Sequence, residues 1–254
     1  MIILIFIYGL LIGSFLNVVI YRIPREENIA WPGSHCPGCG HGLKWYDNIP
    51  LLSYLLLKGR CRYCKEEISL QYPLVEALNG IIYVLLYIFF YQVKLDFVFL
   101  ALISSTLLAI LVIDLKEQLI PDVLVVIVLI SSIIHRALLH FLEGIPFPLT
   151  DSLLGLIIAG GLFLLIVFVS RGGMGGGDVT LIGALGFVLG LKGILTVIFL
   201  SFVLGSVISI FLLAARIKSR KDPIPFGPFI VISFYITLFF GDNILNWYTG
   251  LFIQ

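Results

Sequence analysis

Long apolar runs alternate with short polar segments along most of the chain. About 20 consecutive apolar residues are enough for a helix to cross a bilayer. By this measure the pattern predicts about eight membrane-spanning helices, at roughly residues 2–22, 73–92, 96–114, 122–142, 151–170, 177–191, 193–215 and 226–250. The sixth run is short and rich in glycine, and the last run ends in Trp247 and Tyr248, residue types that favour the headgroup level. We therefore expect an all-α polytopic membrane protein.

One long polar segment interrupts the apolar runs between the first and second predicted spans. The chain is accordingly expected to have three parts: a first transmembrane span over 1–23, a small domain over 24–72, and a membrane-embedded domain over 73–254. A segment as short as 24–72 cannot build a large apolar core. Something other than apolar burial must therefore help it to fold.

The composition supports the membrane assignment. Of the 254 residues, 60% are hydrophobic and 12% are charged, whereas a soluble domain is about 45–50% apolar and about 25% charged. The mean hydropathy is +1.11. The first run has no basic residue before it and no small-residue cleavage site after it. We therefore expect a retained span there and not a signal peptide.

The basic residues are distributed unevenly between the two sides of the predicted eight-span topology. One side holds 13 of the 16 Lys and Arg residues. These are Arg22, Arg25, Lys44, Lys58, Arg60, Arg62, Lys65, Lys116, Arg171, Arg216, Lys218, Arg220 and Lys221. The positive-inside rule makes this side cytoplasmic, so that the polar segment is cytoplasmic and both termini face outward.

Four cysteines form two Cys-x-x-Cys pairs in the polar segment. Cys36 pairs with Cys39 and Cys61 with Cys64, and 21 residues separate the pairs. Two such pairs at this separation suit a tetrahedral zinc ion bound by four thiolates. The cytoplasm is a reducing compartment, which argues against disulfides. The sequence thus predicts a structural zinc site that helps the segment to fold.

Other interpretations of the cysteines stay open. His35 and His41 flank the first pair and could each replace a thiolate, although four cysteines already complete a ligand set. The simplest alternative is four reduced core cysteines without a metal. A catalytic zinc is disfavoured because such a site keeps one coordination position open.

Two carboxylates from different spans reach the predicted cytoplasmic face at similar depth. Asp114 ends the third span after seven apolar residues, and Asp178 begins the sixth span directly after a glycine-rich run that starts at Gly172. A carboxylate at the mouth of a membrane span is costly and is a functional candidate by default. Two carboxylates that share one proton are what an aspartic protease needs to activate water. We therefore predict a catalytic pair of Asp114 and Asp178.

Each acid also has a simpler interpretation. Asp178 could only cap the next helix, and Asp114 could be a solvated acid at a helix end beside Lys116. Asp122 is a rival partner, but it follows Pro121 at a helix start, where its charge favours the helix dipole and a capping role. Eight spans with a glycine-rich break would also suit a transporter, although the chain shows no inverted repeat.

Three sequence blocks closely resemble the bacterial type IV prepilin peptidases, which are GxGD aspartyl proteases of peptidase family A24. The blocks are "GLLIGSFLNVVIYRIP", the cysteine segment from "SHCPGCGHGLKWYDNIP" to "CRYCKEEISLQYPLVE", and the pair "DLKEQLIPD" and "GMGGGDVTLIGALG". Within the last block, Gly175-Gly176-Gly177-Asp178 matches the GxGD signature, in which the glycines let a substrate backbone approach the acid. The family's two catalytic aspartates fall on Asp114 and Asp178.

The resemblance implies an activity in two steps. The substrate would be a prepilin or pseudopilin of a type IV pilus or type II secretion system, cut after the Gly that ends a short basic leader. The new N-terminus would then be methylated from S-adenosylmethionine. The resemblance places the methyltransferase residues in the cysteine segment, at Gly59 and Arg60. It implies a multi-pass protein of the bacterial inner membrane with its active site at the cytoplasmic face.

The chain departs from the family at one position, and one alternative function stays open. Many relatives carry Lys two residues after the second aspartate, where this chain has Thr180. The alternative function is a GxGD protease that cleaves other substrates and does not methylate. No nucleic-acid partner is expected beside the bilayer and the precursor substrate, and the oligomeric state is left open.

Overall fold

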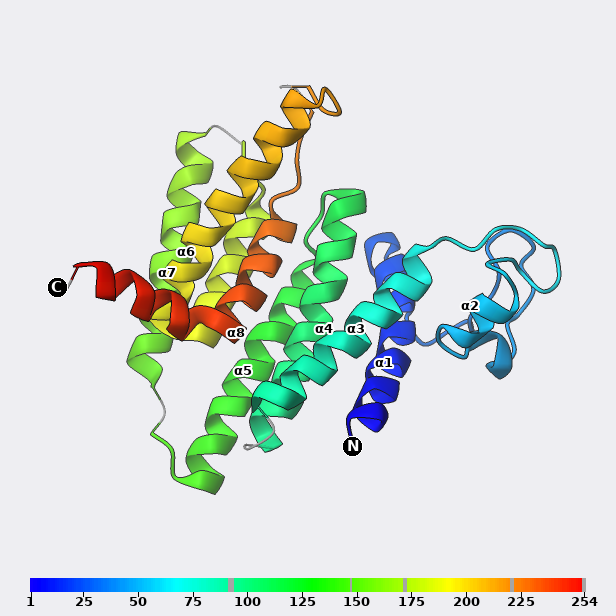
Figure 1. Ribbon diagram of the computed structural model, residues 1–254, viewed down its shortest axis with the longest axis horizontal. Coiled ribbons are helices and arrows are strands. Elements are labelled where there is room, and N and C mark those ends of the chain that lie inside the picture. The colour runs from blue at the N-terminus through cyan, green and yellow to red at the C-terminus, as the bar shows by residue number, and fades with distance from the viewer. Residues whose placement is uncertain (91–93, 147, 171–172, 220–221, 253–254) are drawn as a thin grey trace. The chain divides into compact units, whose positions relative to one another are not determined.

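The computed structural model describes residues 1–90, 94–146, 148–170, 173–219 and 222–252 (Figure 1). The helices are α1 (Ile2–Arg22), α2 (Leu52–Leu56), α3 (Gln71–Phe90), α4 (Lys94–Glu117), α5 (Asp122–Glu143), α6 (Leu149–Val169), α7 (Gly176–Ala214) and α8 (Gly227–Phe252), with 3-10 turns η1 (Ile23–Arg25) and η2 (Trp45–Asn48). The chain divides into two compact units, Met1–Ala109 and Ile110–Gln254. Each unit is described by itself.

The prediction of an all-α protein with many spans is confirmed. Seven of the helices in the described part of the chain are long and apolar enough to cross a membrane. Five of the eight predicted spans correspond to α1, α3, α4, α5 and α6, and the last corresponds to α8. The remaining two both lie within α7, whose 39 residues exceed what one crossing requires.

Helix α7 is interrupted at Gly190 and reverses direction there. Gly190 has φ 71° and ψ −177°, a conformation outside the helical region. Gly183, before the break, packs beside Gly160 of α6. Phe202, after the break, packs on Phe163 of the same helix, with ring centroids 5.8 Å apart. Because both halves lie along the same stretch of α6, α7 is a hairpin of two antiparallel segments, as Figure 1 shows.

Two charged side chains stabilise the reversal. The guanidinium of Arg136 on α5 donates to the carbonyl of Val188, 2.9 Å away, at the end of the first segment. The Asp151 carboxylate, in the first turn of α6, accepts from the N–H of Leu191 at 3.2 Å, where the second segment begins. A cation at a helix C-terminus and an anion at an N-terminus both complement the helix dipole. Two charges inside apolar sequence are thereby given partners.

In the first unit, α1 and α3 cross at a contact made by small residues. A Cβ atom on Gly9 would lie 2.6 Å from the Cα of Gly80, and one on Gly13 would lie 2.7 Å from the Cα of Glu76. Gly9 and Gly13 form a Gly-x-x-x-Gly spacing, which lets membrane helices approach closely. The Asn79 amide of α3 donates to the Gly9 carbonyl at 2.7 Å and strengthens the same crossing.

The segment between α1 and α3 is tied to both helices. Arg22, at the end of α1, is 5% exposed and donates to the carbonyls of Asn28 and Pro32 at 2.9 and 2.6 Å. The buried Glu76 of α3 accepts from the N–H of Leu51 at 2.9 Å, and Leu51 directly precedes α2. These bonds fix the entry of the polar segment at α1 and hold its short helix against the start of α3.

Candidate active site and metal centre

The structure places Asp114 and Asp178 at one end of the second unit. Asp114 lies in the last turn of α4, and Asp178 lies in the first turn of α7. Both are buried within apolar helices, at 5% and 7% exposure, and their carboxylates interact electrostatically. Two acids that come from different helices and share one buried location match the arrangement predicted from the sequence.

Ile120 packs against Gly177 and Gly227, the glycines that lie next to Asp178 and Asp114. A Cβ on Gly177 would lie 2.8 Å from the Cβ of Ile120, and one on Gly227 would lie 3.2 Å from the Cδ1 of Ile120. Gly177 directly precedes Asp178, and Gly227 contacts Asp114. The turn between α4 and α5 and the starts of α7 and α8 therefore meet at the same end of the unit.

The two carboxylates have different hydrogen-bond environments. Asp114 Oδ2 accepts from the backbone N–H of Gly227 at 3.0 Å. The backbone N–H of Gly175 faces the Asp178 carboxylate, whereas Asp178 Oδ1 is buried and has no hydrogen-bond partner within the described ranges. A buried carboxylate oxygen without a partner is costly in a purely structural role. This oxygen is available to a water molecule or a substrate group.

The alternatives for the acids can now be compared with the structure. Asp122 is the first residue of α5 and, unlike the two buried acids, is exposed; its charge lies where it favours the helix dipole, as does that of Asp178 in the first turn of α7. Its side chain makes no capping hydrogen bond, because Pro121 holds the N-cap position. Thr180 is exposed, and its hydroxyl donates to the Gly177 carbonyl at 3.0 Å. Gly172 and Arg171 lie outside the described residues.

Gly227 was not predicted from the sequence. Its N–H donates to Asp114, and a Cβ at this position would lie 2.6 Å from Asp114 Oδ2. The signal that could have indicated it is the run "DPIPFGP", in which Pro225 and Pro228 restrict the backbone on both sides of one glycine. That signal indicates a fixed backbone and a close approach, but it does not indicate which group approaches.

The four cysteine thiols lie together in the first unit. Their Sγ atoms are all within 4.8 Å of one another, and those of Cys36 and Cys64 are 3.8 Å apart. Four sulfurs at about 2.3 Å around a tetrahedral zinc would be about 3.8 Å from each other. The histidines do not join the group, since His41 stacks on Tyr63 with centroids 3.7 Å apart. The donor set therefore fits zinc on four thiolates.

The two cysteine pairs lie in turns with the same hydrogen-bond pattern. The Cys36 carbonyl accepts from the N–H of Gly40 at 2.8 Å, and the Cys61 carbonyl accepts from that of Lys65 at 3.1 Å. Both donors have positive φ, 69° for Gly40 and 64° for Lys65. Backbone N–H groups of Cys64 and Tyr63 lower the pKa of the Cys61 thiol to about 7. At Cys61 this favours the thiolate, the form that binds a metal, whereas burial and the neighbouring thiols raise the pKa values of Cys36 and Cys64.

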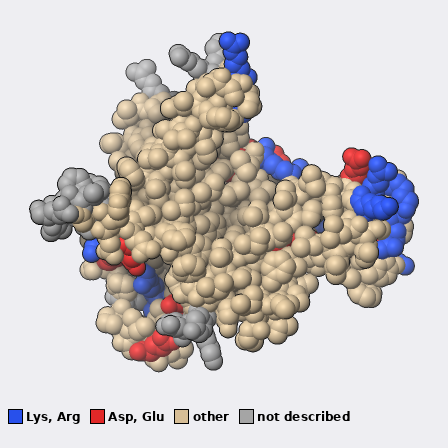
Figure 2. All heavy atoms as spheres, viewed as in Figure 1, with Lys and Arg blue, Asp and Glu red and all other residues tan. Residues whose placement is uncertain are grey.

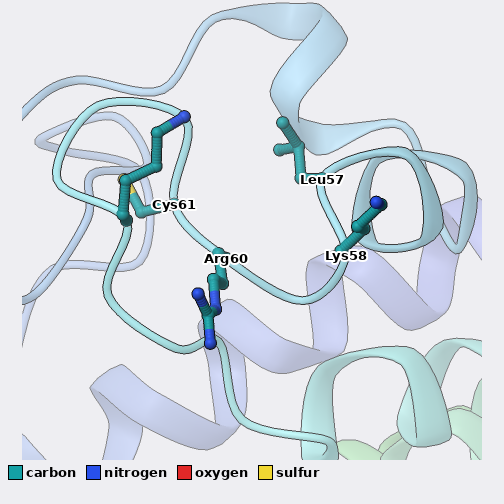
Figure 3. Close-up of a pocket in the computed structure, with 5 residues that line it drawn as sticks. Leu57, Lys58, Arg60 and Cys61 are labelled. Atoms are coloured by element: carbon teal, nitrogen blue, oxygen red, sulfur yellow. The ribbon is translucent and has the colours of Figure 1, made fainter.

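A basic pocket lies beside the second pair (Figure 3). It has a volume of about 330 Å³ and is lined by Leu57, Lys58, Arg60, Cys61 and Lys65. Arg60 forms an ion pair with Glu67 at 3.5 Å. The pocket therefore offers three cationic side chains to a bound group.

The predicted methyltransferase residues lie at this pocket. Arg60 lines it, and the neighbouring Gly59 contributes through its backbone conformation and hydrogen bonds. Gly59 has φ 68°, and a Cβ there would lie 2.8 Å from the Tyr54 hydroxyl oxygen. Its N–H donates to the Tyr54 carbonyl at 2.8 Å, and its own carbonyl accepts from Ile68 at 2.7 Å. Glycine is therefore favoured in the turn that joins α2 to the second cysteine pair.

Comparison with known proteins gives matches over nearly the whole chain. Residues 7–90 match the family described as Bacterial Peptidase A24 N-terminal domain, and residues 101–210 match the Type IV leader peptidase family. Proteins named prepilin leader peptidase/N-methyltransferase are 36% identical in Aeromonas salmonicida (96% of this chain, 92% of the relative), Xanthomonas campestris (94% and 91%) and Pseudomonas aeruginosa (94% and 90%). No solved structure matches.

These matches, together with the buried acid pair in a bundle of membrane helices, define the class as a multi-pass membrane peptidase. The chain belongs to the type IV leader peptidase family. The resemblance stated from the sequence blocks is thereby confirmed.

Proposed function

We propose that this protein removes the leader from type IV prepilins and related pseudopilins and then methylates the new N-terminal residue. The family membership supports both steps, because relatives that cover more than 90% of this chain carry both activities in their name. The main support for the peptidase step is the pair Asp114 and Asp178. Asp114, at the end of one apolar helix, and Asp178, at the start of another, are buried together.

The pair would act as an acid and a base on one water molecule. Two carboxylates this close share one proton, because like charges in a buried site do not both ionise easily. The ionised carboxylate takes a proton from water, and the water oxygen attacks the scissile carbonyl carbon. The protonated carboxyl donates its proton to the carbonyl oxygen. The tetrahedral intermediate then collapses, and the leaving amine receives a proton as the C–N bond breaks.

The backbone around the acids would hold the pair and admit the substrate. Gly227 fixes one oxygen of Asp114, so that this carboxylate is oriented by the start of α8. Gly175 and Gly176 are exposed beside Asp178, and a Cβ on Gly176 would meet no atom within 4 Å. An extended segment of a precursor can therefore approach the acid along Gly175 and Gly176, whereas Gly177 is covered by Ile120.

Zinc would serve the segment 24–72 as a structural ion bound by Cys36, Cys39, Cys61 and Cys64. Four thiolates complete a tetrahedral set and leave no open position for a substrate, so the ion supplies stability and takes no part in the chemistry. We propose that this segment is a separate cytoplasmic domain and that 73–254 forms the membrane-embedded peptidase.

The methyl donor fits the basic pocket only in part. S-Adenosylmethionine carries a carboxylate, which suits Arg60, but also a sulfonium cation, which three neighbouring cations would repel. The pocket lining offers no carboxylate to the sulfonium. Gly59 and Arg60 stay predictions for the methyl-transfer step, and no chemical step is derived through the donor.

The charge distribution supports an orientation with the active site at the cytoplasmic face of the inner membrane. Six of the eight Lys and Arg residues of the second unit lie, in sequence, at the end of α4, directly after α6, or between the end of α7 and the start of α8, and the two acids lie at this end. The positive-inside rule makes that end cytoplasmic, with both termini outside.

One experiment tests both activities together. The purified full chain in lipid nanodiscs is incubated with a prepilin and S-adenosylmethionine, and the N-terminus of the product is measured by mass spectrometry. Loss of the leader after its Gly, with a gain of one methyl group, supports the proposal. A product that is cut but not methylated would favour the protease-only alternative. An uncut precursor would contradict the peptidase assignment.

A further inference from the structure

The short helix α2 presents its apolar face outward. Leu52, Leu55 and Leu56 are 57%, 69% and 80% exposed, while Ser53 between them is buried. Positions i, i+3 and i+4 share one face of a helix, so the three leucines form one continuous apolar surface. Single exposed leucines are ordinary on a protein surface, but three on one face of a short helix in a polar segment indicate a contact partner.

Cationic side chains continue this surface at the end of α2. Leu57 follows the helix and, with Lys58, Arg60 and Lys65, lines the basic pocket described above (Figure 3). Figure 2 shows Lys and Arg gathered over this part of the chain.

The two glutamates of this stretch leave the lysines largely uncompensated. Glu67 pairs with Arg60, and Glu66 faces the Sγ of Cys64 and the backbone of Gly38. The surface formed by Leu52, Leu55, Leu56, Lys58 and Lys65 thus combines an apolar face with positive charge, and it is called the α2 surface below.

The covalent and hydrogen-bond connections of α2 indicate what lies against this surface. The polar segment leaves one candidate span at Arg25 and enters the next at Gln71, so both of its ends are at the membrane. Leu51 donates to Glu76, one turn inside α3, which holds the start of α2 at the level where that span begins. A helix at this depth lies in the headgroup region, where an apolar face and flanking basic residues are both favourable.

We propose that the α2 surface docks on the membrane, with the leucines in the acyl boundary and with Lys58 and Lys65 on the phosphates of anionic phospholipids. The two lysines of the pocket, which are not paired with Glu67 as Arg60 is, match the negative charge of an anionic headgroup. Each lysine near an anionic leaflet contributes attraction on the order of fivefold in a binding constant. The inference depends on neither catalytic step.

The test measures contact between α2 and each lipid directly. A single tryptophan is placed by Leu56→Trp in a full-length background with Trp31→Phe, Trp45→Phe and Trp247→Phe, and Leu55→Trp serves as a second probe. The proteins are reconstituted in nanodiscs of mixed phosphatidylcholine and phosphatidylglycerol. Bromine is placed on the acyl chains of one lipid or the other. Bound zinc verifies the fold of each variant.

We expect strong quenching in both kinds of disc, and more when the bromine is on phosphatidylglycerol. Lys58→Gln with Lys65→Gln should remove this excess, whereas Lys192→Gln with Lys218→Gln, which removes equal charge elsewhere, should leave it. No quenching at either probe would overturn the docking, and equal quenching by the two lipids would overturn recognition of the anionic headgroup. Quenching that disappears when prepilin binds would assign the surface to the substrate instead.

Discussion

The metal centre and the acid pair bring together side chains from distant parts of the sequence by opposite means. The cysteine pairs lie in a segment with little apolar core, where identical turns place the four thiols around one point. The aspartates lie in a bundle of apolar helices, where packing at Ile120 and the hydrogen bond from Gly227 place them. In our proposal one site depends on a bound zinc for its fold, and the other depends on the packing of its helices.

Removal of zinc should give the largest difference between the two sites. Structural zinc on thiolates contributes about 10–16 kcal/mol of apparent binding energy at neutral pH, which is folding energy for a small domain. Cys61→Ser or a strong chelator should therefore abolish hydrogen-exchange protection across residues 34–68. Protection of α7 and α8 should stay unchanged. If the second unit lost protection to the same extent, the separation between the two sites would be wrong.

Substitution of Gly227 should damage the acid pair and spare the metal centre. Gly227→Ala places a methyl group against Asp114 Oδ2 and displaces that carboxylate. A displacement of about 1 Å in a catalytic group can cost about a hundredfold in rate. We expect a loss of that order in kcat for prepilin cleavage, with zinc content unchanged.

Gly161→Ala is the matched control for this prediction. A Cβ at Gly161 of α6 would meet no atom within 4 Å, so this variant should cleave at the normal rate. A Gly227→Ala enzyme as active as Gly161→Ala would show that the contact with Asp114 does not matter.

Substitution of Gly190 should lower the stability of the second unit without changing the metal centre or the acid pair. Its backbone conformation, φ 71° with ψ −177°, is almost exclusive to glycine and costs another residue about 1–3 kcal/mol, and a Cβ would also collide with the Asp151 carboxylate that accepts from Leu191. Gly190→Ala should therefore lower the midpoint of thermal unfolding in detergent relative to Gly161→Ala. An unchanged midpoint would contradict the hairpin described for α7.

The smallest expected effect is at Asp47, inside the cysteine segment. Burial raises the pKa of this carboxyl, but hydrogen bonds from Arg62 at 2.7 Å and from the N–H of Lys44 outweigh burial and leave the pKa below its usual value. The pKa of this carboxyl is lower in the folded protein than in the unfolded chain, where it is about 3.9. The carboxylate therefore stabilises the fold fully at pH values above about 3.9. This stabilisation is lost as the pH falls through the pKa of the folded protein.

Asp47→Asn should therefore cost about 0.5–1 kcal/mol, evenly between about pH 5 and pH 8, because the partner Arg62 is 45% exposed. The measurement is the chelator concentration that removes half of the zinc at each pH. A cost that vanished at the lower end of this range would contradict the depressed pKa.

The sequence predicted the parts of the fold that depend on local pattern. The helix limits are close to the predicted runs, as for α5, predicted at 122–142 and found at Asp122–Glu143. Asp114 and Asp178 were predicted as site residues because a carboxylate within apolar sequence is costly to bury and is therefore a functional candidate. The four cysteines were predicted as metal ligands because two Cys-x-x-Cys pairs at this separation are typical of a zinc site.

Other features could not be predicted because they depend on packing between distant segments. Gly227 acts through its backbone N–H, which every residue except proline also has, so residue type could not indicate its partner Asp114. In the sequence Arg136 and Asp151 are only charges among apolar residues, and their hydrogen bonds at Gly190 could not be predicted without the hairpin of α7. The basic pocket depends on a fold of the chain that lets Lys58 and Lys65 line the same cavity.

The central claim, that Asp114 and Asp178 act together on the scissile bond, is tested most directly by isosteric substitution. Asp114→Asn and Asp178→Asn, each with normal zinc content, are compared with Asp122→Asn, the exposed acid at the start of α5. We predict that either buried variant loses about a thousandfold or more in prepilin cleavage, within the range that acid–base groups contribute, while Asp122→Asn cleaves normally. Substantial cleavage by either buried variant, or an equal loss in Asp122→Asn, would contradict the assignment.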